Sequence, residues 1–297
     1  MKILTIIVSY NFEKWIDKCL GSLQASEYPT DIIVIDNKSQ DNTVSIIKDK
    51  WKNVRLIASD TNLGFGKANN IGMCIAINEG YDAVFLLNQD AWIDKETISV
   101  LANASKDHHE YGILSPIHMN GKGEKPDKGF AFYAGIKDNS DIPHSYTPTD
   151  CKFINAAIWF IRTSVIKEVG GFSPLFYHYG EDKDYVNRVI YHGYKVGYIS
   201  GIKGYHDREY RAPSRKSFLH SEYVYHLSEY SNINRNITSA FTYGVMAVLK
   251  KAALSLVRLK IKDFIPFVSI SARLLLQSSR IIKIRNITKA KHPNFIS

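Results

Sequence analysis

Two acidic segments of this sequence carry side chains that could take part in catalysis. Residues 88–90 (Asn-Gln-Asp) follow the apolar run 83–87, and residues 180–185 follow an aromatic cluster at 176–179. The second segment brings three carboxylates to the predicted start of a helix, namely Glu181, Asp182 and Asp184. A carboxylate at the end of a strand can hold a cation, and one at a helix start can accept a proton. Together the segments indicate metal-assisted group transfer to a hydroxyl, although neither is sufficient alone.

The elements that must position these residues alternate between two patterns in the first half of the chain. Apolar, β-branched runs predict strands at residues 3–8, 32–35, 54–58, 83–87 and 111–115. Helical patterns lie between them at residues 13–25, 43–50, 66–78 and 95–106. This alternation is typical of an α/β fold with a mostly parallel sheet flanked by helices. Ligands of such sheets bind beyond the carboxyl ends of the strands.

The second half of the chain is less regular. Residues 117–150 predict a loop or hairpin excursion, because they are rich in Gly, Pro, Lys and Asp. The strand pattern returns at residues 153–161 and 195–199, and beyond residue 207 the pattern is helical to the end. We therefore expect a catalytic domain at residues 1–215 and a basic helical extension at residues 216–297.

Length and composition narrow the classes of protein further. With 297 residues, 45% of them hydrophobic, the chain can bury a full core. Its three cysteines lie far apart in the sequence, so neither a disulfide framework nor a zinc site is indicated. The first residues lead directly into a strand-like run without a small-residue cleavage site, which predicts a cytoplasmic protein.

The positive charge of the chain is concentrated in its tail. From Lys250 to Ser297 there are eleven Lys or Arg residues and one acid, Asp263, whereas the formal net charge of the whole chain is +9. An enzyme acting on nucleic acid would carry a basic groove through its body, so no nucleic-acid partner is expected.

The tail itself allows three interpretations. Its longest uncharged stretch, residues 236–249, is shorter than the ~20 residues of a spanning helix. We expect Pro266 to separate two amphipathic helices whose Lys and Arg residues gather on one side. Such helices suit an anionic membrane surface, which would make the protein peripheral on the inner face of the cell membrane. The alternatives are a helical cap that packs on the catalytic domain, or the interface of a homodimer.

Polar segments follow three of the predicted strands, at residues 9–11, 36–39 and 88–90. Asp36 either caps the next helix or binds the base or ribose of a nucleotide. Residues 62–72 combine a glycine-rich turn, one Lys and three Asn at a helix start, which favours an anionic ligand. Their spacing matches neither the P-loop nor the dinucleotide fingerprint, and a simple helix cap is the alternative.

Each of the acidic residues also has an ordinary structural explanation. Asp90 can be a turn residue at the end of a strand, and the carboxylates at 181–184 can complement a helix dipole. His206, which follows the strand-like run 195–199, either completes a metal site or has a structural role.

Taken in order, these segments resemble the family 2 inverting glycosyltransferases, which use nucleotide-diphospho-sugars. The resemblance covers roughly residues 3–210. Within the family, the sequence is most similar to bacterial rhamnosyltransferase-type enzymes of surface-polysaccharide assembly, such as those of O-antigen or capsule. It rests on Val8-Ser9-Tyr10-Asn11, Val34–Ser39, Asn62–Gly66 with Asn69-Asn70, Leu86–Asp90, Gly170-Gly171-Phe172, Gly180–Asp184 and His206.

The resemblance implies a fold of the nucleotide-diphospho-sugar transferase type (GT-A-like) and a role for each matching residue. Asp182 would be the catalytic base, and Asp90 with His206 would hold Mg²⁺ or Mn²⁺. The nucleotide-sugar would be bound by eight residues, namely Ser9, Asn11, Asp36, Ser39, Asn62, Lys67, Asn70 and Asn88. Support or acceptor contacts would come from Glu181, Asp184 and Trp159. Asn88 stands where many members have Asp, which should weaken the affinity for a metal.

The predicted function is therefore inverting transfer of a sugar from a UDP- or dTDP-sugar to a hydroxyl of a saccharide acceptor, free or lipid-linked. Acceptor specificity is expected to depend on an aromatic cluster consisting of Tyr133, Trp159, Phe176 and Tyr179. One alternative is a non-catalytic nucleotide-sugar-binding protein of the same fold. The other is a sugar nucleotidyltransferase, although the chain lacks a Gly- and Arg/Lys-rich phosphate loop near its N-terminus.

Overall fold

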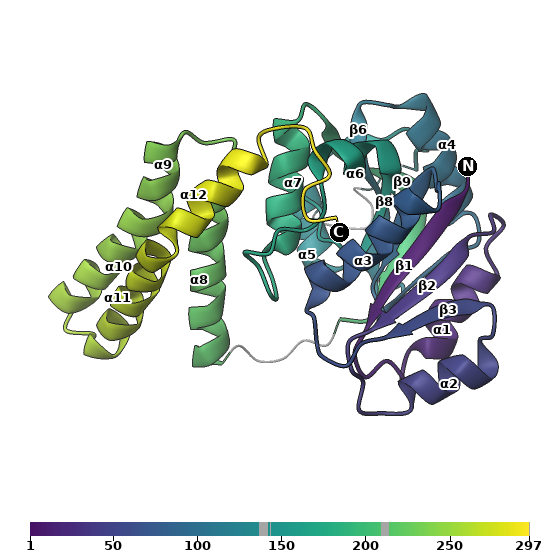
Figure 1. The fold of residues 1–297 in the computed structure, drawn as a ribbon, viewed down its shortest axis with the longest axis horizontal. Coiled ribbons are helices and arrows are strands. Elements are labelled where there is room, and N and C mark those ends of the chain that lie inside the picture. Colours follow the sequence, from purple (N-terminus) through teal and green to yellow (C-terminus); the bar gives the residue numbers. More distant parts are fainter. Residues whose placement is uncertain (137–141, 143, 209–213, 297) are drawn as a thin grey trace.

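A mixed β-sheet of nine strands forms the centre of the protein (Figure 1). The computed structural model describes residues 1–136, 142, 144–208 and 214–296. In spatial order the strands are β3 (Val54–Ala58), β2 (Asp31–Asp36), β1 (Ile3–Ser9), β4 (Ala83–Leu87), β8 (Ile158–Arg162), β6 (Tyr111–Asn120), β9 (Lys195–His206) and β5 (Ala91–Ile93), while β7 (Thr149–Asp150) pairs with β9.

The first four strands of this order are parallel, and their carboxyl ends meet at one edge of the sheet. Ser9 at the end of β1 lies opposite Asp36 at the end of β2. Because both faces of these strands are covered, their sequences are continuously apolar instead of alternating. The side chains of neighbouring Ile6 and Ile7 accordingly belong to two different hydrophobic cores, one on each face of the sheet.

Seven helices cover the two faces of the sheet within the described part of residues 1–208. They are α1 (Ile16–Gln24), α2 (Thr43–Lys50), α3 (Phe65–Asn78), α4 (Thr97–Asp107), α5 (Lys128–Ala134), α6 (Thr163–Val169) and α7 (Glu181–Tyr191). The core on one face includes residues of α3, α6 and α7, and the core on the other includes residues of α1 and α4. The predicted α/β fold and the elements predicted for residues 3–115 are confirmed.

The structure corrects the prediction for residues 117–161. β6 continues to Asn120, and the supposed loop contains helix α5, which Asp127 caps by accepting hydrogen bonds from two backbone N–H groups. β8 begins only at Ile158, so residues 153–157 are not part of a strand. Residues 137–141 and 143 of the predicted excursion lie outside the described residues.

The C-terminal part of the chain is a separate layer of helices packed beside the sheet domain (Figure 1). It consists of α8 (Arg215–Ser231), α9 (Ile237–Phe241), the π-helical turn η2 (Thr242–Met246), α10 (Ala247–Val257), α11 (Ile261–Leu276) and α12 (Ser278–Ile287). A third hydrophobic core joins these helices and includes Leu227, Val248 and Leu274. The domain boundary predicted between residues 215 and 216 stays a prediction.

Pro266 does not separate two helices, as the sequence had suggested, but lies inside α11. The break falls at residues 258–260, where Leu259 has a φ of 55°. Pro266 lacks the N–H that would bond the carbonyl of Lys262, and the guanidinium of Arg215 donates to that carbonyl instead. The lost helical bond is therefore replaced from α8.

One continuous helix of 21 residues, Ile237–Val257, comprises α9, η2 and α10. Its most apolar stretch has a mean hydropathy of 1.4 and is 33% buried inside the protein. In the part of the chain that the structure describes, it is the one helix that could cross a membrane by length and composition, although a core helix can pass the same test. The expectation that this region is too short to span has to be corrected, because the helix continues through Lys250 and Lys251.

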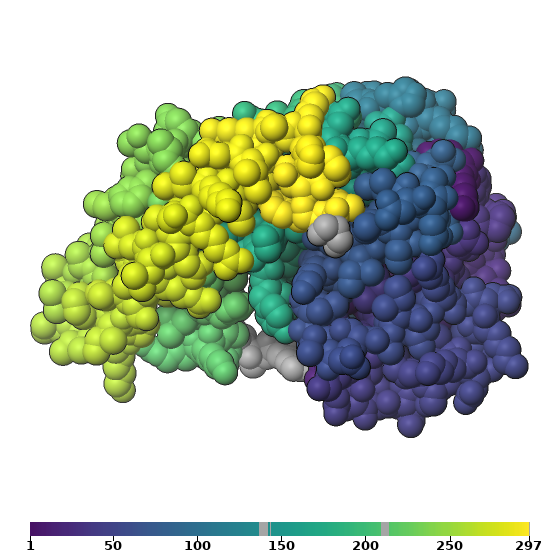
Figure 2. Space-filling view, in the orientation of Figure 1, coloured from purple at the N-terminus to yellow at the C-terminus, as the bar shows by residue number. Residues whose placement is uncertain are grey.

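The last described residues are not helical, which also differs from the prediction. After α12 the chain returns to the sheet domain and lies against α3 and α6 (Figures 1 and 2). The N–H of Gly171 donates to the carbonyl of Asn294 over 2.8 Å, and the N–H of His292 donates to the carbonyl of Glu168 over 2.9 Å. An ion pair of 2.7 Å joins Lys291 to Glu168.

A buried arginine on α7 connects these segments. Nε of Arg188 lies 2.9 Å from the carboxylate of Asp184, one turn earlier on the helix, and both side chains are almost completely buried. The other two guanidinium nitrogens donate to the carbonyls of Val169 and Gly171, each over 2.7 Å. Arg188 thus fixes the first turns of α7 to the glycine turn that also binds the C-terminal segment.

Candidate active site

The polar residues predicted at the ends of β1 and β2 form one hydrogen-bonded network. The hydroxyl of Ser9 donates to Oδ1 of Asp36 over 2.8 Å, and the N–H of Ser39 donates to Oδ2 over 2.9 Å. The hydroxyl of Ser39 also donates to Asp36. Asp36 is buried by this network and does not cap α2, whose N-cap position is held by Asn42.

Asn11 joins the same network from the loop after β1. Its N–H donates to the hydroxyl of Ser39 over 2.8 Å, and its side-chain oxygen accepts from the N–H of Gln40 over 2.8 Å. Asn11 has a φ of 54°, a conformation that Asn tolerates better than most residues. The structure therefore gathers four predicted residues, Ser9, Asn11, Asp36 and Ser39, at the carboxyl ends of two adjacent strands.

A cleft of about 580 Å³ opens beyond these strand ends. Four of the predicted residues line it, namely Ser9, Asn62, Asn88 and Asp90. Gly64 forms part of its wall with a φ of 78°, and a Cβ there would lie 2.5 Å from the carbonyl oxygen of Tyr177. Only glycine allows these two loops to approach so closely.

A smaller pocket of about 140 Å³ adjoins the cleft and contains the predicted base. Asp182 and Glu181 line it, and the two cavities share Asn88 and His178 in their walls. The carboxylate of Asp182 therefore lies in a pocket next to the cleft. This adjacency is what a transfer between two bound substrates requires.

Asp90 and His206 face each other because β5 pairs with β9. Ala91 lies opposite His206 in that pairing, and Nε2 of His206 is 3.4 Å from Oδ1 of Asp90. Nδ1 of His206 is buried without a hydrogen-bond partner. Among the described residues, no group of three or more His, Cys, Asp or Glu side chains is arranged so that it could hold a metal ion by itself. A carboxylate and an imidazole fit a divalent cation that takes its remaining ligands from phosphate oxygens and water.

The two acids at the start of α7 have perturbed pKa values. Burial raises the pKa of the Asp182 carboxyl, while the N–H of Lys183 and the charge of Arg208 oppose this change. Burial, and then the negative charge of Asp182, raises the pKa of Glu181 to about 7. Oε2 of Glu181 is buried without a hydrogen-bond partner. Such pairs of acids in a pocket are typical of catalytic sites.

Asp184 has a different environment from its two neighbours. It does not line either cavity, since its carboxylate binds Arg188 and accepts a hydrogen bond of 3.3 Å from the hydroxyl of Ser231. This arrangement agrees with a supporting role and leaves no free oxygen pointing towards an acceptor.

Lys67 and Asn70 are not brought together with the other predicted donor residues. They line a separate pocket of about 350 Å³ next to Phe295 of the C-terminal segment. The side chain of Asn70 binds the backbone of Phe172 twice, over 2.7 and 2.9 Å. In this structure Asn70 therefore links α3 to the segment that precedes α7.

The predicted aromatic cluster is only partly at the site. Trp159 and Phe176 are buried, and Trp159 stacks against Phe172 with ring centroids 6.1 Å apart, so neither can contact an acceptor. Tyr133 and Tyr179 are exposed.

Several site residues were missed by the sequence analysis, among them Arg208, His178, His220, Tyr177 and Asn155. Arg208 lies two residues after His206, which was the signal that could have identified it. His220 comes from α8, and no pattern in the sequence connects that helix with the strand ends.

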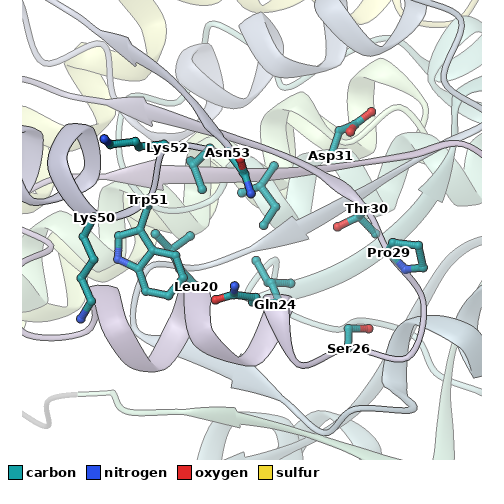
Figure 3. A pocket seen from close by; sticks show the side chains of 13 residues that line it. Leu20, Gln24, Ser26, Pro29, Thr30, Asp31, Lys50, Trp51, Lys52 and Asn53 are labelled. Atoms are coloured by element: carbon teal, nitrogen blue, oxygen red, sulfur yellow. The ribbon is translucent and has the colours of Figure 1, made fainter.

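A further pocket, of about 370 Å³, lies at the opposite edge of the sheet (Figure 3). Leu20 and Gln24 of α1 line it, together with Trp51 and Asn53 from the connection between α2 and β3. Its carboxylate, Asp31, accepts a hydrogen bond from Tyr81. Since neither Asp182 nor the pair Asp90–His206 is near, the candidate active site is the cleft with its adjoining pocket.

Comparison with known proteins decides the family. The model of glycosyl transferase family 2 matches residues 5–170, more than half of the chain. The chain belongs to this family. It is 26% identical over 235 residues to the poly(ribitol-phosphate) beta-N-acetylglucosaminyltransferase TarS of Staphylococcus aureus, which covers 76% of the chain and 38% of TarS. It is 22% identical over 250 residues to an N-acetylglucosaminyl-diphospho-decaprenol L-rhamnosyltransferase of Mycobacterium tuberculosis. This match covers 74% of the chain and 81% of the rhamnosyltransferase.

Solved structures confirm the GT-A-like fold of this family 2 protein. The structure of Staphylococcus aureus TarS 1–349 with UDP-GlcNAc matches with a TM-score of 0.57 and 16% identity, covering 100% of the chain and 89% of TarS 1–349. The structure of GalNAc-T7 with UDP, GalNAc and Mn²⁺ matches with a TM-score of 0.57 and 15% identity, covering 84% of this chain and 54% of GalNAc-T7. The chain spans only 38% of the length of full TarS.

The raised pKa of Glu181 predicts how stability depends on pH. An unfolded Glu ionises near 4.5 and the folded one near 7, so unfolding between these values releases a proton and is favoured as pH rises. We expect Glu181→Gln to unfold like the wild type at pH 4.5 and to be more stable by on the order of 2 kcal/mol at pH 8. Urea unfolding at both pH values measures the difference, and parallel pH curves for the two proteins would contradict the assignment.

Proposed function

We propose that this family 2 protein transfers a sugar, with inversion, from a UDP- or dTDP-sugar to a hydroxyl of a saccharide acceptor in surface-polysaccharide synthesis. The observation that carries the proposal is the pocket of Asp182, which adjoins the cleft at the carboxyl ends of β1 and β4 and shares wall residues with it. The names of the relatives support the reaction class, since they describe an N-acetylglucosaminyltransferase and a rhamnosyltransferase. Either sugar is a candidate for the donor.

The nucleotide would lie in the cleft. Ser9 lines the cleft, and its hydroxyl is bound to the buried Asp36. The amide side chains of Asn62 and Asn88 line the cleft as well. The structures of TarS with UDP-GlcNAc and of GalNAc-T7 with UDP share this fold, which supports a nucleotide-sugar donor.

Asp90, which lines the cleft, and the buried His206 beside it would hold a divalent cation, Mg²⁺ or Mn²⁺. Such an ion, when bound, offsets the negative charge of a departing diphosphate. The amide of Asn88 contributes an oxygen but no charge, so the site has one carboxylate. The residues of the chain do the remaining work of binding, orientation and proton transfer.

Asp182 would act as the base towards the acceptor. Its carboxylate takes the proton of the attacking hydroxyl while the oxygen forms a bond to the anomeric carbon and the bond to the diphosphate breaks. The electron pair leaves with the diphosphate, and one displacement inverts the configuration. Glu181, held largely protonated below pH 7, can donate a hydrogen bond inside the pocket. Arg208 places a positive charge beside Asp182.

The replacement Asp182→Asn tests the base directly. The amide preserves shape and cannot accept the proton, so we expect turnover to fall by about 10²-fold or more. Release of UDP or dTDP from a panel of nucleotide-sugars, with and without saccharide acceptors, measures the effect. Asp17→Asn, an exposed residue paired with Lys50, is the matched control.

The products of this assay also separate the alternatives. Near wild-type turnover in Asp182→Asn would remove this residue from its role. A nucleotidyltransferase would release no nucleotide from a nucleotide-sugar but would release pyrophosphate from a nucleoside triphosphate and a sugar 1-phosphate, whereas a non-catalytic binding protein would release neither product.

The cation site predicts metal-dependent nucleotide binding. We expect Mn²⁺ to strengthen the binding of UDP or dTDP, because Asp90 and His206 would hold the ion and its charge would offset that of the diphosphate. In Asp90→Ala this enhancement should fall by at least tenfold, with the affinity for nucleotide alone largely kept. Isothermal titration of both proteins with UDP, dTDP and GDP, with and without Mn²⁺, makes the comparison. Equal enhancement in the two proteins would place the cation elsewhere.

We also propose that the protein acts at the cytoplasmic surface of an anionic membrane, where a lipid-linked acceptor would be available. The turn between α10 and α11 is apolar and exposed: Val257 is 79% exposed and Leu259 is 85% exposed. Basic residues alternate with them, namely Arg258, Lys260 and Lys262. If two copies met through this turn, their positive charges would repel one another. Anionic lipid therefore complements the turn better than a second copy does.

The membrane proposal predicts a local effect of charge at the turn. Leu259→Glu should lower the fraction of protein bound to vesicles of phosphatidylglycerol by about tenfold, since it adds a negative charge and removes an inserting side chain. The matched control is Leu276→Glu at the far end of α11, where Leu276 is 87% exposed. Cosedimentation measures the binding, and equal binding of all three proteins would refute the proposal.

A further inference from the structure

Two exposed tyrosines lie on the short segment that leads into α7. Tyr177 is 63% exposed and Tyr179 is 62% exposed, whereas Phe172 and Phe176 of the same segment are buried in the cores. The two large rings therefore contribute little to folding. Exposed aromatic rings beside a catalytic pocket commonly contact ligands.

The two tyrosines lie at different parts of the site. Tyr177 lines the cleft that contains Ser9 and Asp90. Tyr179 lines the adjoining pocket with Asp182 and Arg208. Asp182 is thus flanked by Tyr179 in its own pocket, while Tyr177 belongs to the neighbouring cleft.

The backbone of this segment is held in an unfavourable conformation. Tyr179 has a φ of 68°, which costs a bulky residue on the order of 1 kcal/mol or more and persists only where the surroundings fix it. Gly180 follows with a φ of 88°. The hydroxyl of Tyr177 donates to the carbonyl of Asn62 over 3.1 Å, and Nε2 of His220 lies 3.2 Å from the carbonyl of His178. The segment is therefore anchored from the donor loop on one side and from α8 on the other.

Two histidine rings lie next to the ring of Tyr179 and are inclined to it. The ring centroid of Tyr179 is 4.0 Å from that of His178, with an interplanar angle of 47°, and 6.3 Å from that of His220, with an interplanar angle of 60°. The C–H face of a pyranose can stack on the ring of Tyr179, and its hydroxyls remain free for Asp182 and Asn155 in the same pocket. Because the segment is anchored on both sides, the ring of Tyr179 can orient an acceptor at little cost in conformational entropy.

We propose that Tyr179, with His178 and His220, is the platform on which the acceptor saccharide stacks. The inference rests on the proposed function, and it assigns to α8 a direct part in acceptor binding. The ligand class is a pyranoside with one apolar C–H face, placed so that a hydroxyl points to Asp182.

Saturation-transfer NMR can test the platform without a known acceptor. The probes are methyl glycosides of N-acetylglucosamine, glucose, galactose and rhamnose, offered to the wild type with saturating UDP or dTDP and Mn²⁺. We expect at least one glycoside to receive saturation at its ring C–H protons. Tyr179→Ala should reduce that signal by about tenfold, and Tyr179→Phe should keep it because the ring remains. Tyr146→Ala, which removes an exposed tyrosine away from both cavities, is the control.

Two outcomes would overturn the platform. One is a signal in Tyr179→Ala within twofold of the wild type, and the other is the absence of saturation transfer to every glycoside in the wild type. Nucleotide titration of the same samples distinguishes the causes. Nucleotide binding without a sugar signal refutes only the platform, whereas failure of every nucleotide to bind refutes the proposed function itself.

Discussion

The guanidinium of Arg188 is buried beneath α7, and the groups that it binds belong to two segments that meet there. It pairs with Asp184 on its own helix and donates to the carbonyls of Val169 and Gly171 in the turn after α6. A buried charge that lost its partners would cost several kcal/mol, so this set of contacts leaves little freedom for either segment. The direction of α7, and with it the position of Asp182 at its first turn, depends on that constraint.

The chemistry of the site follows from where this constraint puts two neighbouring carboxylates. Glu181 and Asp182 are adjacent in sequence, and both have raised pKa values because the first turn of α7 is buried against the sheet domain. Asp182 accepts a hydrogen bond from the backbone N–H of Lys183, and the positive charge of Arg208 also lowers its pKa. Oε2 of Glu181 has no hydrogen-bond partner. The two neighbouring acids thus differ in environment, because a backbone N–H and a guanidinium oppose the effect of burial on the pKa of Asp182.

The sheet and the convergence of strand ends could be predicted from the sequence, because strand ends in a parallel sheet meet at one edge and the motifs occur at those ends. The position and contacts of single side chains could not be predicted from the sequence. Nothing local distinguishes Asn70, which binds the backbone of Phe172, from Asn62, which lines the cleft. The course of α11 through Pro266 depended on a distant donor, Arg215, and the conformation of the segment before α7 depended on contacts with Asn62 and His220. Tertiary contacts decided each of these cases.

The return of the chain end to the sheet domain also sets an order of events during synthesis. The carbonyl of Thr288 meets the ring of His192 at the end of α7, and Asn294 binds the turn that Arg188 holds. These residues follow α7 by about a hundred positions, which a ribosome takes about 5 to 20 seconds to add. Until they emerge, α7 lacks part of its surroundings. The candidate site is therefore completed late, when α10, α11 and the exposed turn between them have already left the ribosome.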